Sequence, residues 1–131
     1  MYFKVSFCNP LQSEIVTVGA LAPEQVLEHL HELNWAQYLD SMQGVAQESI
    51  YYSPSLCIEE MNGAYGLECT AVGESSDYEF YIFYKRPKVI NGKLDDAYVS
   101  DLLEQTMADA ERLLQLLFTN SYEALEEEFS R

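Results

Sequence analysis

The chain has 131 residues, of which 22 are Asp or Glu and 7 are Lys or Arg, giving a formal net charge of −15. This length fits one domain, residues 1–131, and the 48% hydrophobic and 13% aromatic content argues against a disordered chain. A strongly negative protein repels nucleic acid and anionic membranes and attracts basic partners. Direct binding to nucleic acid or to a membrane is therefore not expected.

The first residues, Met1-Tyr2-Phe3-Lys4, have no basic segment followed by an apolar stretch and a cleavage site, so a cytoplasmic location without a secretory signal is predicted. Cysteines are odd in number: Cys8, Cys57 and Cys69. They are predicted to be reduced, buried thiols. No cofactor is expected.

Residues 2–8 alternate between apolar and polar side chains, which predicts a half-buried strand. Residues 14–18 form a β-branched segment that can pair with it, and Gly19-Ala20 is expected to break this segment. Pro23 suits the first turn of a helix, and Asn34 followed by Gln37 resembles the capping box of a second, short helix. A further extended segment is predicted at residues 49–52. The inward-facing residues of the two helices are predicted to be Val26, Leu27, Leu30 and Leu33 in the first, and Trp35, Tyr38, Leu39 and Met42 in the second.

Residues 56–86 are predicted to form a three-stranded antiparallel meander. Asn62-Gly63 is a strong signal for a type I′ hairpin turn, and it places Leu56 opposite Cys69. A four-residue loop at 73–76 then places Leu67 opposite Ile82, whereas a five-residue loop would exchange the faces of the third strand. We prefer the four-residue loop because it builds one continuous apolar face.

With this register the opposite face combines carboxylates and aromatic rings: Glu59, Glu68, Glu79, Tyr81 and Phe83, with Cys57, Thr70 and Lys85 beside them. The aromatic side chains of this face are large for a fully wet surface, so both faces of the sheet are expected to be partly covered. Carboxylates gathered on a sheet face can raise one another's pKa values and act as an acid and base pair. Without a cleft, however, solvated side chains are the more common outcome.

Four of the seven basic residues lie at the end of this meander and just after it, between Lys85 and Lys93. Pro87 is expected to end the strand and Asn91-Gly92 to form a turn. In so acidic a molecule the basic loop is expected to pair with carboxylates of the same chain, with a phosphate as the alternative.

A long helix of about 20 residues is predicted from Asp95-Asp96 to Leu117, because acidic residues favour a helix N-terminus and apolar residues follow at helical spacing. A last helix is predicted to begin at an Asn120–Glu123 capping box and to bury Leu125 and Phe129. Near its end comes the acidic run Glu126, Glu127 and Glu128, where the helix dipole disfavours negative charge. This run is either a solvated end or a contact for a basic partner.

No motif for a catalytic nucleophile, a phosphate loop or a calcium loop is present, and His29 and His31 are two residues apart and do not share a helix face. No metal site and no enzymatic activity are therefore expected. The predicted fold class is α+β: an antiparallel sheet that contains the three-stranded meander, packed against N-terminal helices and a long C-terminal helix.

The excess of negative charge and the face of aromatic rings beside carboxylates predict a non-enzymatic protein that binds and neutralises a basic protein partner. The expected contact residues are Glu59, Glu68, Glu79, Tyr81, Phe83, Glu126, Glu127 and Glu128. In general character, though through no shared motif, the chain resembles the small acidic immunity proteins with which bacteria inactivate their own cationic toxins, often nucleases. Two alternatives remain: an acidic secretion chaperone, which would be a homodimer, and a small-ligand binder or enzyme that uses the sheet-face carboxylates.

Overall fold

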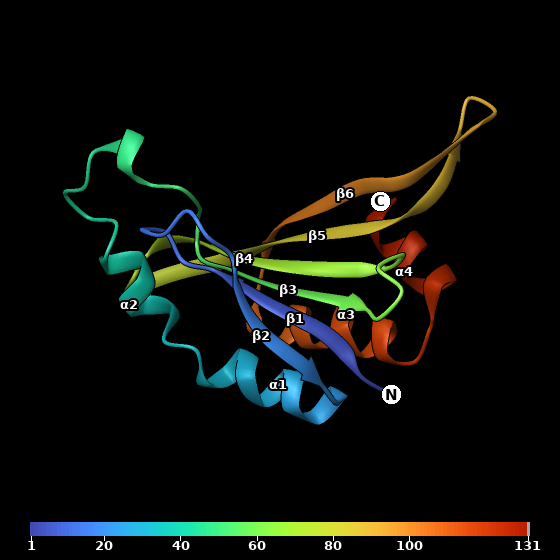
Figure 1. The fold of residues 1–131 in the computed structure, drawn as a ribbon, viewed down its shortest axis with the longest axis horizontal. Helices are drawn as coiled ribbons and strands as arrows, with labels where there is room; N and C mark the ends of the chain where they lie inside the picture. Colours follow the sequence, from blue (N-terminus) through green and yellow to red (C-terminus); the bar gives the residue numbers. More distant parts are fainter. Residues whose placement is uncertain (131) are drawn as a thin grey trace.

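The computed structural model describes residues 1–130 and has an α+β fold, as the sequence predicts. Its six-stranded antiparallel sheet has the strand order β2-β1-β3-β4-β5-β6 (Figure 1). The strands are β1 (Phe3–Cys8), β2 (Val16–Leu21), β3 (Ser55–Glu60), β4 (Gly66–Glu74), β5 (Asp77–Ile90) and β6 (Lys93–Gln105). The helices are α1 (Pro23–Glu32), α2 (Trp35–Asp40), α3 (Met107–Phe118) and α4 (Tyr122–Phe129), with a 3₁₀ turn, η1 (Gln47–Ser49).

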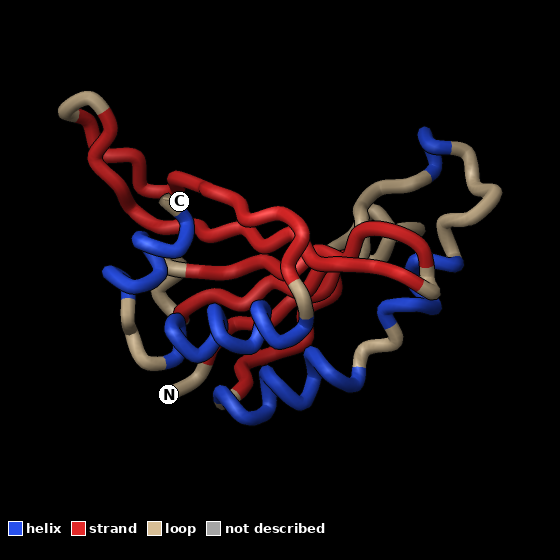
Figure 2. Tube along the Cα trace, turned by 180° about the vertical axis from the view of Figure 1, so that it is seen from behind, coloured by secondary structure: helices blue, strands red, loops and turns tan. Residues whose placement is uncertain are grey.

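The helices α1, α3 and α4 lie over one face of the sheet, and Figure 2 shows them in front of the strands when the molecule is seen from behind. The core lies between these two layers, where α1 buries Val26 and Leu30 and α3 buries Leu113 and Leu114. Among residues 1–130, no helix covers the other face, which we call the open face. The expectation that both faces are partly covered is therefore wrong as far as the helices are concerned.

The β3–β4 register is the predicted one, with Leu56 opposite Cys69. The turn is different, because Gly63 has a positive φ of 76° whereas Asn62 is not among the residues with positive φ. The backbone N–H of Glu60 donates to the carbonyl of Tyr65 at 2.9 Å, so the loop holds the four residues 61–64. A type I′ turn needs positive φ at two central residues, and that prediction is wrong here.

The β4–β5 connection is shorter than predicted, because β4 ends at Glu74 and β5 begins at Asp77. Leu67 consequently lies opposite Tyr84 instead of Ile82. A shift of two residues keeps every side chain on its face, since side chains in a strand alternate with a period of two. The predicted division between core face and open face therefore holds in this hairpin.

The long C-terminal helix is not formed, and this is the main correction to the predicted fold. Residues 93–105 are the edge strand β6, which pairs with an extended β5. Asn91 and Gly92 have φ angles of 52° and 78°, so the type I′ turn lies at this connection. Pro87 does not end β5 but lies where the pairing register shifts between Arg86 and Lys88, a place where a residue without a backbone N–H is tolerated. The β5–β6 hairpin extends beyond the other strands (Figure 1).

Helix α3 begins at Met107 because Thr106 and Asp109 form a capping box. The Thr106 Oγ1 accepts the N–H of Asp109 at 3.1 Å, and the Asp109 carboxylate accepts the N–H of Thr106 at 2.9 Å. In α4 the N-cap is Ser121 and not Asn120, whereas the predicted burial of Leu125 and Phe129 is confirmed.

The N-terminal half differs from prediction only in detail. Strand β2 pairs with β1 as expected, but it continues through Gly19, where a bulge accommodates the glycine's φ of 135°. The predicted cap of α2 is confirmed, since the Asn34 side chain accepts the N–H of Gln37 at 3.2 Å. Residues 47–49 form η1, so the extended segment predicted at residues 49–52 is not a strand.

Candidate functional site

The open face is built as rows of side chains that run across neighbouring strands, because directly paired residues of an antiparallel sheet point to the same side. One row contains Lys4, Glu59, Gly66, Lys85 and Val99. The next contains Ser6, Cys57, Glu68, Phe83 and Asp101. The residues predicted for partner contact are therefore distributed over several rows of this face.

The charge of Glu59 is largely balanced. Its Oε2 lies 3.1 Å from the Nζ of Lys85, and Lys4 is its direct neighbour on β1. Both side chains of the ion pair are about one-third exposed, so the pair is screened by solvent and contributes little to stability. Glu59 is consequently less available to a partner than a carboxylate without a cationic neighbour.

Glu68 has a different environment, because its hydrogen bonds come from neutral groups. The Cys57 Sγ donates to Oε1 at 3.1 Å and the Thr70 Oγ1 donates to Oε2 at 3.3 Å. Burial and, secondly, the Glu68 charge raise the pKa of the Cys57 thiol, and the same two causes raise the pKa of Cys69 to about 12. The three cysteines are free, as predicted, with Cys8 and Cys69 buried and Cys57 half-buried.

Tyr81 and Glu79 lie toward one end of the open face. Tyr81 is opposite Thr70 and half-buried, and Glu79 is opposite Val72. Phe83 is also half-buried and lies directly beside Glu68 on the neighbouring strand. Glu68 and Phe83 are therefore brought together, whereas Glu79 lies four residues before Phe83 in β5.

A shallow depression of about 270 Å³ adjoins Phe83 on the open face. Gly66 contributes no side chain, and a Cβ built on it would lie 2.9 Å from the Cγ of Glu59 and 3.0 Å from the carbonyl oxygen of Ile58. The glycine thus permits the close approach of β3 and leaves space between its neighbours. The depression is lined by Cys57, Glu59, Gly66, Leu67, Glu68, Phe83, Lys85 and Val99.

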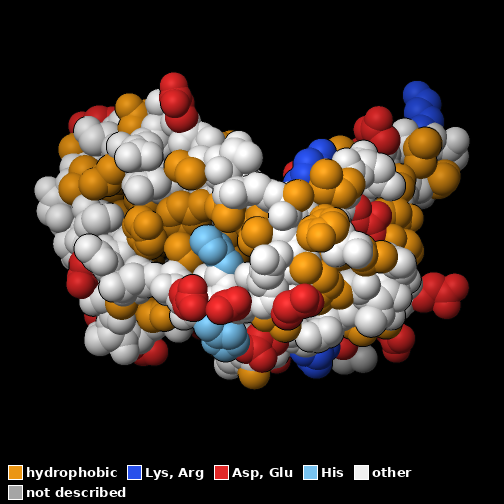
Figure 3. All heavy atoms as spheres, turned by 60° about the horizontal axis from the view of Figure 1, so that its bottom comes forward, with side chains coloured by type: hydrophobic (Ala, Val, Ile, Leu, Met, Phe, Trp, Pro, Cys, Tyr) orange, Lys and Arg blue, Asp and Glu red, His pale blue; other side chains and the backbone are white. Residues whose placement is uncertain are grey.

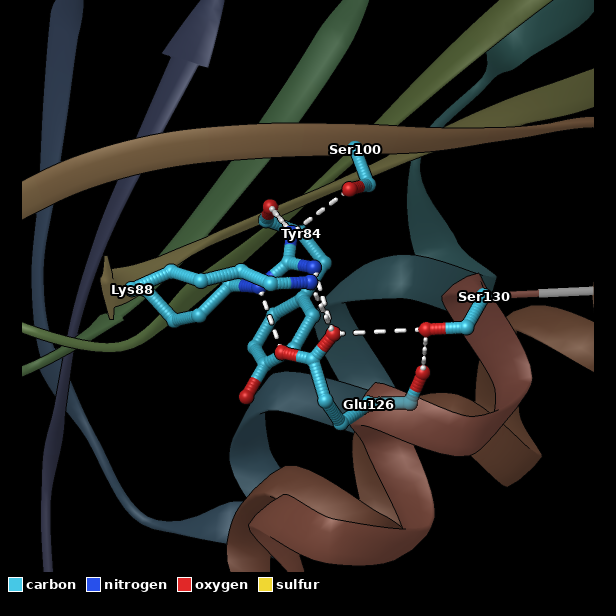
Figure 4. Close-up of polar contacts among 6 residues, drawn as sticks. Tyr84, Lys88, Ser100, Glu126 and Ser130 are labelled. Carbon is cyan, nitrogen blue, oxygen red and sulfur yellow. Dashed lines mark hydrogen bonds and ion pairs between the residues drawn. The ribbon is translucent and has the colours of Figure 1, made fainter. Parts of the chain in front are cut away.

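Of the predicted acidic run, Glu126 is engaged inside the molecule (Figure 4). Arg86, only 2% exposed, donates from Nε to Oε1 at 2.8 Å and from Nη2 to Oε2 at 2.7 Å. Lys88 donates to the same Oε2 at 3.0 Å. The hydrogen bonds from Arg86, with the Lys88 ammonium nearby, lower the pKa of Glu126 to about 2.

Two further acceptors and two aromatic rings surround the Arg86 guanidinium. Its Nη1 donates to the Ser100 hydroxyl at 2.8 Å and to the Tyr84 carbonyl at 3.1 Å. The guanidinium carbon also lies 4.7 Å from the Tyr84 ring centroid and 4.8 Å from that of Tyr98. The predicted intramolecular use of the basic segment is thus confirmed at Lys85, Arg86 and Lys88.

The other two members of the acidic run, Glu127 and Glu128, also lie on α4. Glu128 accepts a hydrogen bond from Arg112 at 2.7 Å, which ties α4 to α3. Glu127 is exposed on the same helix. We therefore narrow the proposed contact residues to the open face, because Glu126 and Glu128 already neutralise arginines of the chain.

Negative charge is widespread outside the open face. In Figure 3, which shows the molecule with its lower side turned forward, Asp and Glu side chains are scattered over the surface and Lys and Arg are few. Charge on this side therefore outlines no single patch. Among the described residues, no three His, Cys, Asp or Glu side chains are placed to hold a metal ion, and no helix is long and apolar enough to cross a membrane.

One residue of the open face is missed by the sequence analysis. Asp101 is paired with Phe83 and is exposed on β6, a segment predicted to be helical. The available signal is the Thr106–Asp109 capping box, which marks the true start of the helix and leaves residues 93–105 for a strand. Comparison with protein-family models, with curated proteins and with solved structures gives no match.

Proposed function

We propose that this chain is a non-enzymatic acidic binding protein that neutralises a basic protein partner in the bacterial cytoplasm, in the manner of an immunity protein or antitoxin. The observation that carries the proposal is the open face, where half-buried aromatic rings and carboxylates lie together with no helix above them. Aromatic side chains provide contact energy in protein interfaces, while complementary charge accelerates encounter. The net charge of −15 supports a basic partner over an acidic one.

The geometry favours binding over catalysis. Glu59 is paired with Lys85, and Glu68 receives hydrogen bonds from Cys57 and Thr70, so the two carboxylates have separate partners. The depression beside them is shallow, with a volume of about 270 Å³, close to the lower limit for a small-molecule site. A protein surface that docks on the sheet fits this shape better than a small substrate.

The test is isolation of the tagged protein with its bound proteins, followed by mass-spectrometric identification and an activity assay of the basic component. The proposal expects a basic protein in a stoichiometric complex whose toxic activity, for example cleavage of nucleic acid, is abolished by one equivalent of this chain. A large secreted protein with a basic C-terminal domain encoded beside this gene would be the expected source. A complex that retains full activity, or a partner that is itself acidic, would contradict the proposal.

A secretion chaperone is the second candidate, and a specific observation favours it. Val89 and Leu94 pair directly across the projecting β5–β6 hairpin and are 64% and 68% exposed. Exposed apolar pairs of this kind are typical of association surfaces. A chaperone would be a homodimer, so light scattering across a range of protein concentrations separates the two candidates.

A further inference from the structure

The row of the open face that contains Phe83 has a carboxylate on each side of the aromatic ring. Glu68 on β4 is the direct neighbour of Phe83 on β5, and Phe83 is the direct neighbour of Asp101 on β6. Neighbouring strands are about 4.8 Å apart, so the strands that carry the two carboxylates are about 9.6 Å apart, with Phe83 on the strand between them.

The charges of these two carboxylates are not neutralised by a cation. Glu68 accepts hydrogen bonds from a thiol and a hydroxyl, both neutral. Asp101 is exposed, and its side chain makes no hydrogen bond or ion pair with any residue between 1 and 130. Lys85, the nearest basic residue along the same face of β5, is paired with Glu59. The row therefore retains two negative charges on a face that also bears an aromatic surface.

Space for a side chain is available beside this row. The depression at Gly66 is lined by Phe83 and by Val99, which is half-exposed, and the ion-paired Glu59 and Lys85 also line it. An aliphatic stem can lie along these apolar groups, while a cationic end reaches the carboxylates.

We propose that this row, Glu68-Phe83-Asp101, is the anchor site for an arginine side chain of the basic partner; this inference rests on the proposed function. The planar guanidinium stacks on the Phe83 ring and donates hydrogen bonds to the carboxylate on that side, while the second carboxylate adds electrostatic attraction. A lysine ammonium has no flat face to stack and only a point charge to offer, so arginine fits better. Arginine and aromatic residues are also the side chains that most often dominate the energy of protein interfaces.

The test is an NMR titration of the full chain with three blocked tripeptides at matched ionic strength: Gly-Arg-Gly, Gly-Lys-Gly and the neutral Gly-citrulline-Gly. The Arg peptide is expected to bind in the millimolar range and to shift the resonances of Phe83, Glu68, Asp101 and Val99. The citrulline peptide is expected to bind about tenfold more weakly or not at all, because it has no charge. The Lys peptide is expected to fall between them.

Two variants localise the binding. Glu68→Gln with Asp101→Asn removes both charges but keeps one acceptor oxygen, for either Cys57 or Thr70, and it is expected to weaken Arg-peptide binding about tenfold. Glu24→Gln with Glu28→Gln is the matched control on α1, and it is expected to change binding less than about twofold. Circular dichroism and unfolding curves verify that each variant is folded.

The possible outcomes separate this site from the function. Equal binding of the Arg and Lys peptides, or shifts that are spread over the acidic surface and persist in the Glu68→Gln/Asp101→Asn variant, would overturn the arginine anchor. A basic partner could still be neutralised through another surface in that case. Conversely, an Arg peptide bound at Phe83, in a chain whose partner retains full activity in the complex, would support the site and contradict the proposed function.

Discussion

The ion pair between Arg86 and Glu126 joins β5 to α4, and replacing Glu126 with glutamine tests how much it contributes to stability. Removing one partner of a fully buried ion pair typically costs about 3–5 kcal/mol, because the other charge stays buried. Here Arg86 is 2% exposed but the Glu126 side chain is 36% exposed, so solvent screens part of the interaction. The glutamine also keeps one acceptor oxygen, and Ser100 and Tyr84 still accept from Arg86. We therefore expect Glu126→Gln to lower the free energy of unfolding by about 2 kcal/mol at neutral pH.

The loss of unfolding free energy in Glu126→Gln is expected to decrease as the pH falls. The pKa of Glu126 is lowered from 4.5 to about 2 by the hydrogen bonds from Arg86. A carboxyl with a lowered pKa in the folded state stabilises the protein above its unfolded pKa and loses that contribution as the pH falls. The difference between wild type and Glu126→Gln should therefore be largest above pH 4.5 and shrink as the pH falls toward about 2.

Urea unfolding followed by tryptophan fluorescence, using the buried Trp35, measures this difference at several pH values. Glu123→Gln is the control, because Glu123 is exposed in the first turn of the same helix and should change stability by less than about 0.5 kcal/mol. A loss in Glu126→Gln no larger than in this control, or one that does not depend on pH, would refute the role assigned to the ion pair.

Two further predictions concern the cap of α3 and the cysteines. Thr106→Ala removes the hydroxyl that accepts the N–H of Asp109 and should lower the free energy of unfolding by about 1 kcal/mol in urea; no change would mean that the capping box does not stabilise α3. Burial raises the pKa of Cys69 to about 12 and also raises that of Cys57, so both thiols should resist a thiol reagent at pH 8 and react after unfolding. Rapid reaction of the native protein would contradict the burial of Cys69 and the partial burial of Cys57.

The division of the sheet into core face and open face could be predicted from the sequence because it depends only on alternation. The β4–β5 register differs from prediction by two residues, yet Phe80 and Ile82 remain in the core and Phe83 remains on the open face. The identity of the turns was harder to predict, since two Asn-Gly pairs occur and only Asn91-Gly92 has positive φ at both residues.

Strand β6 could not be distinguished from a helix by its apolar residues. Leu102 lies opposite Ile82 and packs against the core in the strand, and the same residue also fits a helical stripe that continues into α3. Asp95 and Asp96 resemble a helix N-terminus, although they lie in a hairpin arm. Misassignment of this segment is the reason that Asp101 was missed as a neighbour of Phe83.

The roles of Glu126 and Glu128 also depended on tertiary structure. Arg86 is 40 residues from Glu126 in the chain, and no local pattern connects the two. The sequence indicates only that basic residues in an acidic chain are expected to find carboxylates, which is what Lys85, Arg86 and Lys88 do. The carboxylates that are available to a partner can be identified only once these ion pairs are known.

Association kinetics with the co-purified protein measure whether the open face binds a basic partner. Charge reversal of Glu68, Glu79 and Asp101 to lysine is compared with charge reversal of Glu24, Glu28 and Glu32 on α1, which changes the net charge equally. The open-face triple variant is expected to slow association at least about tenfold at low salt, and high salt should reduce the difference from wild type. The α1 triple variant is expected to slow it about twofold or less. Equal association rates for the two triple variants would contradict the claim.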